Sequence, residues 1–327
     1  MSVSVPCLFI VIPCYNEEAV VGGTADVLTE LLEEMVKQGQ VSADSRMVFV
    51  DDGSKDGTWE EILRCAKKCP WAEGIALQRN VGQQNALYAG LMEVRKRCDA
   101  AVSLDADLQD DPSLIPAMVR QFCAGNDVVY AVRKSRRGEG AGKRGTAWLF
   151  YRILGWMGAD MPRDCGDFRL LSRKALEELS CFHEHNPFLR GLIPLLGLPS
   201  SILYFERRPR RAGKSKYSLG KMLALAVQAV TSLTAWPVYL VFWLGTGLAL
   251  PSVAWLVWLL LIRQEGIGEK VLFASLWAAA GLLLLGIGII GLYSVRIWQE
   301  VSGRPRYRIR ERIFPSGYFW HEKTKRN

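Results

Sequence analysis

The sequence predicts an α/β domain, with a mostly parallel sheet covered by helices on both faces, followed by a membrane-associated segment. Three observations support this fold class. Short apolar runs alternate with helical stretches in the first half of the chain, polar residues follow these runs, and residues 222–298 carry almost no charge. A chain of 327 residues is long enough for a catalytic domain and a second module.

Five short apolar runs have the length and composition of buried parallel strands. They cover residues 7–13, 46–52, 74–77, 100–107 and 127–132. Four stretches between them carry helix-forming residues at helical spacing. These are residues 17–37, 57–68, 83–97 and 112–122. The alternation is typical of βαβ units, in which ligands bind beyond the carboxyl ends of the strands.

Polar residues stand at that edge of the predicted sheet. They follow four strands in turn: Tyr15-Asn16-Glu17, Asp51-Asp52-Gly53-Ser54, Arg79-Asn80 and the acidic run SLDADLQDDP (103–112). Because the carboxyl ends of parallel strands meet at one edge, we expect these groups to converge on one crevice. No GxGxxG follows the first strand and no GxxxxGK[ST] occurs, which argues against dinucleotide binding and P-loop chemistry.

The acidic run gathers four carboxylates in a chain whose formal net charge is +8. Side chains alternate along a strand, so Asp105 and Asp107 are expected on the same side of the backbone, where they can share a divalent cation. Oxygen ligands suit Mg²⁺ or Mn²⁺, and such an ion takes further ligands from substrate phosphates. A second interpretation of Asp105 is that it faces a nucleotide. Asp110 or Asp111 is expected to cap the helix that begins near Pro112.

The second half of the chain predicts membrane segments. Residues 222–262 and 271–295 contain no formal charge, and one span needs about 20 residues. The first stretch is too long for one crossing, so it holds either an in-plane helix and one span or two spans. Basic clusters on both sides of the two stretches favour the cytoplasmic side, which requires an even number of crossings. An in-plane helix followed by two spans satisfies this requirement.

The predicted organisation has four parts. These are a cytosolic α/β domain (1–216), an interfacial amphipathic helix (217–236), a two-helix transmembrane hairpin (237–298) and a basic cytosolic tail (299–327). The expected localisation is the inner (cytoplasmic) membrane, as a multi-pass protein with the catalytic domain and both termini in the cytosol. Eight scattered cysteines without a CxxC pair fit reduced thiols there. Since the basic residues cluster near the predicted spans, the membrane, and not a nucleic acid, is the expected partner.

Six motifs occur in a fixed order along the chain. They are VIPCYNEE (11–18), VDDGSKDGT (50–58), RNVGQQNAL (79–87), SLDADLQDDP (103–112), DCGDFRLLSR (164–173) and RRAGKSKYS (210–218). Together they resemble glycosyltransferase family 2, above all its polyprenyl-phosphate branch, which includes bacterial undecaprenyl-phosphate glucosyltransferases and is similar to dolichyl-phosphate mannose synthases. The resemblance implies a GT-A fold that binds a nucleotide sugar. It also implies a homo-oligomer, because members of this branch can be tetramers.

The resemblance assigns roles to residues at the strand ends. Those implied to bind the nucleotide sugar are Pro13, Tyr15, Glu17, Asp52, Arg79, Asp105 and Gln109. Asp52 is implied near the ribose or base, and Asp105 and Asp107 resemble the family's metal motif, for Mg²⁺ or Mn²⁺. For Tyr15 the alternative is a packed aromatic side chain, and for Arg79 it is a surface cation.

The implied catalytic residue is Asp167, the aspartate before Phe-Arg in DCGDFRLLSR, and Asp164 is a second, weaker candidate. A lipid monophosphate has a second pKa of about 6 and is mostly ionised at pH 7. Asp167 is therefore either a base or a residue that orients the acceptor or completes the metal shell. The residues implied to meet the acceptor phosphate are Arg169, Arg210, Lys214 and Lys216. For the basic cluster, the alternative is positive-inside topology alone.

The predicted function is metal-dependent, inverting transfer of a sugar from a nucleotide sugar to a polyprenyl phosphate at the cytosolic membrane face. Glucose from UDP-glucose is the favoured donor and undecaprenyl phosphate the favoured acceptor. One alternative is the same reaction with another donor, such as GDP-mannose, and a second is a catalytically silent membrane protein that binds a nucleotide sugar. A processive polysaccharide synthase is disfavoured, because the chain has no Arg-Trp pair and so no QxxRW motif.

Overall fold

The computed structural model describes most of one compact unit and part of a second. The described residues are 5–133, 165–182, 188–205, 243, 268–301, 303, 305–314 and 319–321. The first unit consists of residues 1–152, 160–216 and 305–327, and the second of residues 153–159 and 217–304. The candidate site lies in the first unit.

The described residues of the first unit form a nine-stranded sheet in the order β7-β5-β6-β4-β1-β2-β3-β8-β9. The strands are β1 (Leu8–Cys14), β2 (Arg46–Asp51), β3 (Ala72–Leu77), β4 (Ala100–Ser103), β5 (Val128–Arg133), β6 (Cys165–Ser172), β7 (Ser200–Phe205), β8 (Ile309–Ile313) and β9 (Phe319–His321). Strands β4, β1, β2 and β3 are parallel neighbours, whereas β6 runs antiparallel to β4 and β5. This arrangement confirms the predicted α/β fold with a mostly parallel sheet.

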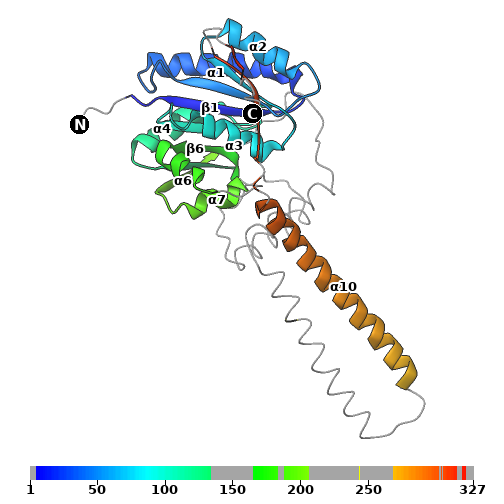
Figure 1. The fold of residues 1–327 in the computed structure, drawn as a ribbon. Coiled ribbons are helices and arrows are strands. Elements are labelled where there is room, and N and C mark those ends of the chain that lie inside the picture. Colours follow the sequence, from blue (N-terminus) through cyan, green and yellow to red (C-terminus); the bar gives the residue numbers. More distant parts are fainter. Residues whose placement is uncertain are drawn as a thin grey trace. The chain divides into compact units, whose positions relative to one another are not determined.

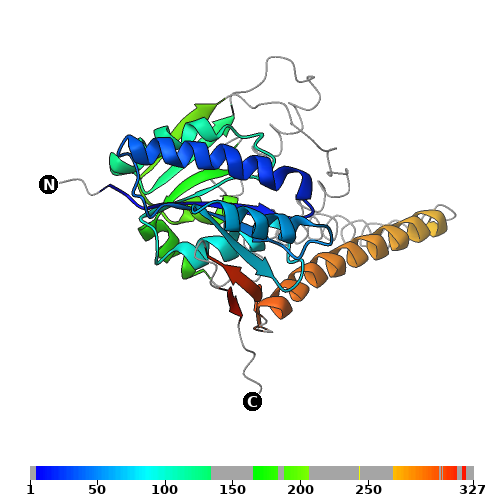
Figure 2. The same ribbon diagram turned by 90° about the horizontal axis from the view of Figure 1, so that it is seen from above.

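Helices cover both faces of this sheet (Figure 1). They are α1 (Glu18–Lys37), α2 (Thr58–Lys68), α3 (Gln83–Val94), the 3₁₀ turn η1 (Pro112–Leu114), α4 (Ile115–Cys123), α6 (Arg173–Ser180) and α7 (Leu189–Leu195). One face is covered by α1 and α2, which Figure 2 shows side by side over the strands, and the other by α3, α6 and α7. The second unit contains α10 (Gly268–Val301).

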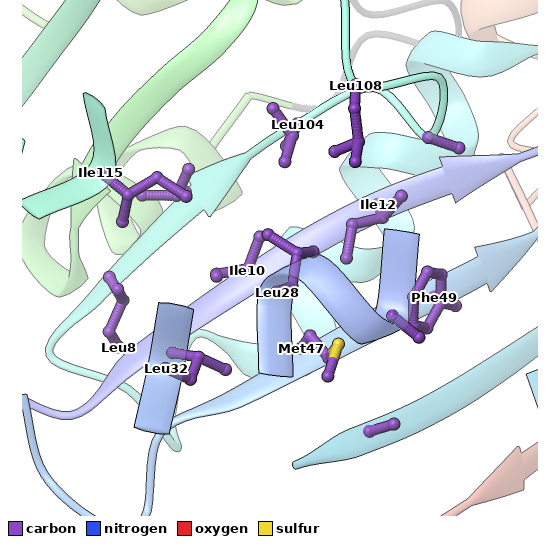
Figure 3. Close-up of a cluster of buried hydrophobic side chains, with 14 of the residues drawn as sticks. Leu8, Ile10, Ile12, Leu28, Leu32, Met47, Phe49, Leu104, Leu108 and Ile115 are labelled. Atoms are coloured by element: carbon purple, nitrogen blue, oxygen red, sulfur yellow. The ribbon is translucent and has the colours of Figure 1, made fainter. Parts of the chain in front are cut away.

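The central strands bury side chains on both faces. Ile10 and Ile12 of β1 pack with Leu28 of α1 in one core (Figure 3), whereas the alternate residues Phe9 and Val11 belong to the core beneath α3. Burial on both faces explains why β1 reads as the continuous apolar run LFIVIPC and not as an alternating pattern.

Helix α3 approaches the sheet closely at Gly90. A Cβ atom there would lie 2.4 Å from Cγ1 of Val11 and 2.7 Å from Cγ2 of Val50, both in stiff core side chains. We expect Gly90→Ala to lower the free energy of unfolding by about 1–3 kcal/mol through overpacking, although alanine favours helix. The matched change Gly23→Ala, in α1 with no atom within 4 Å of its Cβ, should raise it by about 0.5–1 kcal/mol. Urea denaturation of both variants measures the difference, and equal stabilities would contradict the close packing of α3.

The C-terminal basic residues join the sheet of the first unit. Residues 309–313, which the sequence places in the basic tail, form β8 and pair antiparallel with β3. Strand β9 extends the sheet beyond β8. The edge of the parallel sheet next to β3 is therefore covered by the chain's own C-terminal segment.

The predicted membrane placement is not supported. Within the part of the chain that the structure describes, no helix combines the length and the apolar character that a bilayer crossing needs. The prediction rested on the absence of formal charge in residues 222–262 and 271–295 and on the basic clusters beside them. The two predicted spans are not confirmed, and the localisation as a multi-pass inner-membrane protein is contradicted by this finding. Residues 217–236 of the predicted interfacial helix lie outside the described residues.

Candidate active site

Asp52 follows β2 at the carboxyl edge of the sheet and is buried. Its Oδ1 accepts a hydrogen bond from the backbone N–H of Val81 at 2.7 Å, and its Oδ2 accepts from the N–H of Gly82 at 2.9 Å and from Nδ2 of Asn80 at 3.0 Å. The loop after β3 is therefore held to the end of β2. Burial raises the pKa of Asp52 to about 6, although the N–H groups of Val81 and Gly82 oppose this shift.

The next residue, Gly53, allows the same two loops to approach each other. It has a φ of +65°, and a Cβ there would lie 2.7 Å from the carbonyl carbon of Arg79 and from the backbone nitrogen of Asn80. Only glycine fits both the conformation and the contact. The side chain of Arg79 is exposed at this edge.

The loop after β1 is tied to the loop after β2. The backbone N–H of Asn16 donates to Oγ of Ser54 at 3.0 Å, and Oδ1 of Asn16 accepts from the N–H of Lys55 at 2.9 Å. Asn16 has a φ of 53°, a conformation that asparagine tolerates better than most residues. The N–H of Glu17 donates to Oγ1 of Thr58 at 2.9 Å.

The other two predicted nucleotide-binding residues of this region differ in exposure. Pro13 lies within β1, opposite Val50 of β2. The side chain of Tyr15 is 37% exposed, so it is not an aromatic residue of the core. Tyr15 therefore stands at the carboxyl edge with a ring that is accessible to a ligand.

The acidic run lies on a turn, because β4 ends at Ser103 and not at the predicted residue 107. The alternation of side chains nevertheless continues beyond the strand: Asp105 and Asp107 are partly exposed, and Ala106 between them is buried. The hydroxyl of Thr24 on α1 donates to the carbonyl oxygen of Ala106 at 2.6 Å and fixes the turn. The two carboxylates are thus presented together by a turn and a helix contact.

Two glutamines contact these carboxylates. Nε2 of Gln83, the first residue of α3, donates to Oδ1 of Asp105 at 2.9 Å. Gln109 donates to Asp107 twice, through its backbone N–H at 3.2 Å and through Nε2 at 2.9 Å. Gln109, predicted to contact the nucleotide sugar, is therefore placed beside the candidate metal ligand.

The remaining carboxylates of the run differ in role. Oδ1 of Asp111 accepts the N–H of Ser113 at 3.0 Å, which caps η1 as the sequence suggested for one of the two residues. Asp110 is buried. Its negative charge is one of those that raise the pKa of Asp105.

Negative charge is concentrated around Asp105. Burial, followed by repulsion from Asp167, Asp110 and Asp107, raises the pKa of Asp105 to about 7, and Arg190 opposes the shift. Carboxylates that repel one another at a partly open edge, with oxygen atoms as donors, fit a divalent cation. Within the described residues, no group of three or more His, Cys, Asp or Glu side chains could hold a metal by itself. A cation here would therefore need further ligands from a substrate.

Asp167 of β6 is buried within a set of hydrogen-bond donors. Its Oδ1 accepts from Nη2 of Arg169 and from Nε of Arg190, each at 3.0 Å. Its Oδ2 accepts from Nη2 of Arg190 at 3.1 Å and from Nε2 of Gln84 at 3.0 Å. Burial alone would raise the pKa of Asp167, but Arg190 and Arg169 hold it below its ordinary value. Asp167 is thus an ionised and weakly basic carboxylate.

The pairing of β6 with β4 places Asp167 beside the acidic turn. Ser103, the last residue of β4, is paired with Arg169 in the antiparallel register. Its hydroxyl donates to the carbonyl oxygens of Asp167 and Arg169. This contact fixes the end of β4, two residues before Asp105, against β6.

Sequence reasoning missed three residues of this site: Gln83, Gln84 and Arg190. The two glutamines belong to the motif RNVGQQNAL, but no role was predicted for them. Arg190 lies in α7, and the available signal was a lone arginine in the otherwise uncharged helix LRGLIPL. The Oε1 atom of Gln84 is buried and accepts no hydrogen bond from the described residues.

Four predicted site residues lie outside the described residues. They are Asp164, Arg210, Lys214 and Lys216. At the carboxyl edge of the sheet, the structure therefore brings the residues predicted to bind nucleotide and metal together with Asp167 and Arg169. The described residues do not include the basic cluster predicted for the acceptor phosphate.

Hydrogen bonds join the polar groups in a continuous series along the carboxyl edge. The loop after β1 contacts that after β2, Asp52 holds the loop after β3, and the glutamines at the start of α3 reach Asp105 and Asp167. This acidic edge of a parallel sheet places the protein in the class of α/β folds that bind ligands beyond the carboxyl ends of their strands.

Comparison with known proteins gives the family. Residues 9–180 match the family described as Glycosyl transferase family 2. The "Uncharacterized glycosyltransferase YkoT" of Bacillus subtilis (strain 168) is 41% identical, over 94% of this chain and 93% of its own. The "Bactoprenol glucosyl transferase" of Shigella phage SfX is 32% identical, over 93% of this chain and 98% of its own. The chain belongs to glycosyl transferase family 2 and is a glycosyltransferase, and the resemblance to the polyprenyl-phosphate branch is confirmed.

A solved structure agrees with this fold. Glucosyl-3-phosphoglycerate synthase from Mycobacterium tuberculosis, crystallised with phosphoglyceric acid, matches with a TM-score of 0.50 at 19% identity, over 70% of this chain and 79% of that chain. At this identity the likeness concerns the fold alone. It supports the predicted GT-A architecture.

Proposed function

We propose that this glycosyltransferase moves a hexosyl group from a nucleoside-diphosphate sugar to a polyprenyl phosphate, with inversion at the anomeric carbon. The observation that carries the proposal is the acidic edge of the sheet, where Asp52, Asp105, Asp107 and Asp167 lie at the ends of β2, β4 and β6 in a family 2 fold. UDP-glucose is the favoured donor and undecaprenyl phosphate the favoured acceptor, because relatives that match over most of the chain are named bactoprenol glucosyl transferases.

The donor side of the site suits a nucleotide. Asp52 is an acceptor for ribose or base donors, and the exposed Tyr15 and Arg79 border the same edge. Asp105 and Asp107 would hold Mg²⁺ or Mn²⁺, since their mutual repulsion is relieved by a cation. When bound, such an ion neutralises charge that develops on the departing diphosphate.

Asp167 has the chemistry of a positioning group and not of a general base. Both of its oxygens already accept two hydrogen bonds, and its pKa is lowered. A phosphate acceptor is already ionised and needs no deprotonation, so alignment with the anomeric carbon is the main requirement. Gln84, held by Asp167, has a buried acceptor atom to which a sugar hydroxyl could donate.

The acceptor side rests on residues outside the described part of the chain. Arg210, Lys214 and Lys216 carry the charge needed to bind a phosphomonoester, and Arg169 is occupied by Asp167. We assign the acceptor phosphate to these three residues. Asp164 stays a second candidate beside Asp167.

The pH dependence of kcat/KM for the donor should reflect the protonation of Asp52. Its carboxylate accepts two backbone N–H bonds, and protonation at a pKa of about 6 would turn one oxygen into a donor facing another donor. We expect kcat/KM for the donor, measured at saturating metal, to fall about tenfold per pH unit as the pH drops below about 6. A flat profile between pH 5 and pH 7 would contradict this role of Asp52.

The experiment that tests the proposed function is transfer from a panel of radiolabelled donors. Purified protein with Mg²⁺ or Mn²⁺ receives UDP-glucose, UDP-galactose, UDP-N-acetylglucosamine or GDP-mannose together with undecaprenyl phosphate, and label is followed into the organic phase. We expect UDP-glucose to label the lipid. Transfer from GDP-mannose alone would replace the donor but keep the reaction class. Metal-dependent nucleotide binding without transfer from any donor would overturn the proposal in favour of a silent binding protein.

A further inference from the structure

The C-terminal segment of the first unit, residues 305–314, packs along the strand that leads into the donor loop. Ile313, Arg312, Glu311 and Ile309 of β8 are paired with Gly74, Ile75, Ala76 and Leu77 of β3. The register shifts between Ala76 and Leu77, at the carboxyl end of β3. Beyond the shift, the backbone N–H of Gln78 donates to the carbonyl oxygen of Arg308 at 2.8 Å.

Two arginines of this segment contact other elements of the first unit. Arg312 forms a two-pronged ion pair with Glu93 of α3, with Nε to Oε2 at 2.8 Å and Nη2 to Oε1 at 3.0 Å. Nη2 of Arg306 donates to the carbonyl oxygen of Phe182 at 2.6 Å, and its guanidinium lies 4.5 Å from the ring centre of Tyr88. Arg306 and Arg312 therefore form structural contacts within the first unit. The positive-inside interpretation of the basic tail did not predict such contacts.

The Arg312 ion pair is sheltered. The side chains of Arg312 and Glu93 are 19% and 28% exposed. They line a cavity of about 300 Å³ together with Phe314. A paired, bidentate contact in such a place holds its partners more firmly than a surface pair does.

The loop that this segment supports is the one that holds Asp52. Gln78 begins the loop, and Asn80, Val81 and Gly82 at its far end donate the three hydrogen bonds that Asp52 accepts within the described residues. A displacement of the end of β3 would therefore move the donors that orient the buried carboxylate. Arg308 is thus connected to Asp52 by its hydrogen bond with Gln78, by the backbone of residues 78–82 and by the hydrogen bonds of that loop to Asp52.

We propose that residues 305–314 are a positioning element of the donor site, with Arg312 and Arg306 as the residues that fix it. The segment completes the edge of β3 and sets the loop at residues 78–82, so that Asp52 is ready to receive the nucleoside. The inference rests on the proposed donor role of Asp52. It predicts that loosening the segment weakens nucleotide binding more than it slows the chemical step.

The test compares nucleotide affinity with turnover in the full-length protein. Titration calorimetry with UDP and with GDP, each with Mn²⁺, gives the dissociation constant, and the transfer assay gives kcat and donor KM. We expect Arg312→Met to raise the dissociation constant of the preferred nucleotide and the donor KM about five- to tenfold, with kcat within about twofold of wild type. Arg312→Lys should recover part of the affinity, and Arg306→Met should act in the same direction.

Arg173→Met is the matched control, because Arg173 also pairs with a carboxylate, that of Asp99, but both side chains are 46% exposed and neither residue belongs to β3, β8 or the loop at residues 78–82. It should leave the dissociation constant unchanged. A lowered melting temperature in Arg312→Met and Arg306→Met with unchanged nucleotide affinity would overturn the inference, since the segment would then be structural only. If Arg312→Met does not fold, Arg306→Met and Arg312→Lys decide. Wild-type protein that binds neither nucleotide would overturn the proposed function itself, and the inference with it.

Discussion

Asp107→Asn is expected to lower kcat for sugar transfer by about 100-fold or more, because it removes one of two carboxylates that would hold the cation at the departing diphosphate. Asparagine keeps the size of the side chain and an oxygen that can accept from Gln109, so the turn should remain folded. The measurement is initial-rate transfer over a range of Mn²⁺ concentrations. The variant should also need more metal for half-maximal activity.

Asp111→Asn supplies the control for this experiment. It makes the same chemical change in the same acidic run, but Asp111 caps η1, and asparagine is an equally good cap. Its activity should stay within about twofold of wild type. Equal losses in Asp107→Asn and Asp111→Asn would mean that the net charge of the run matters and that a specific metal ligand does not.

Arg190→Gln is expected to have the second largest effect, a loss in kcat of about 100-fold with a smaller change in donor KM. Arg190 donates to both oxygens of Asp167, and its removal leaves that buried carboxylate with Arg169 and Gln84 alone. A shift of these side chains by about 1 Å is enough to cause such a loss. Steady-state kinetics with varied donor separates kcat from KM.

If Arg190 were only structural, Arg190→Gln would lower the stability of the protein, and a lower activity could follow from that loss alone. A second readout is therefore needed. Arg190→Lys keeps the charge but not the fork of two donors, and should recover a fraction of kcat. Arg173→Met, which breaks an exposed ion pair, should change neither kcat nor KM. If Arg190→Gln lowers the melting temperature but keeps kcat, Asp167 does not depend on Arg190 for catalysis.

Local patterns in the sequence predict the first half of the fold well. The apolar run at 46–52 corresponds to β2 and the helical stretch at 57–68 to α2, each within one residue. These elements are buried on the expected faces, so periodicity and composition carry the necessary information. The convergence of the strand-end groups also follows from the parallel order of the strands.

The parts that were not predicted depend on contacts between distant residues. The acidic run leaves the strand at Ser103 because its turn is fixed by Thr24, 82 residues away in the chain from Ala106. Composition did not reveal strand β8 in its basic sequence, because Arg312 pairs with Glu93 and Arg310 lies over the ring of Trp59. Composition could not reveal either contact.

The chemistry of Asp167 shows the same limit. Its motif marked it as functional, but its lowered pKa depends on Arg190, 23 residues further along the chain, and its set of donors on Gln84, 83 residues before it. Neither residue stands in a pattern that points to Asp167. The proposal that Asp167 is a positioning group and not a base therefore rests on contacts that its own motif does not contain.

The central claim is that the acidic site at the carboxyl edge of the sheet is the donor site. The most direct measurement is an experimental structure of the protein with UDP and Mn²⁺. The account predicts a nucleoside beside Asp52 and the loop at residues 78–82, with the diphosphate and the ion at Asp105 and Asp107. A nucleotide bound elsewhere, such as in the cavity bordered by Glu93 and Arg312, with the acidic site empty, would contradict it.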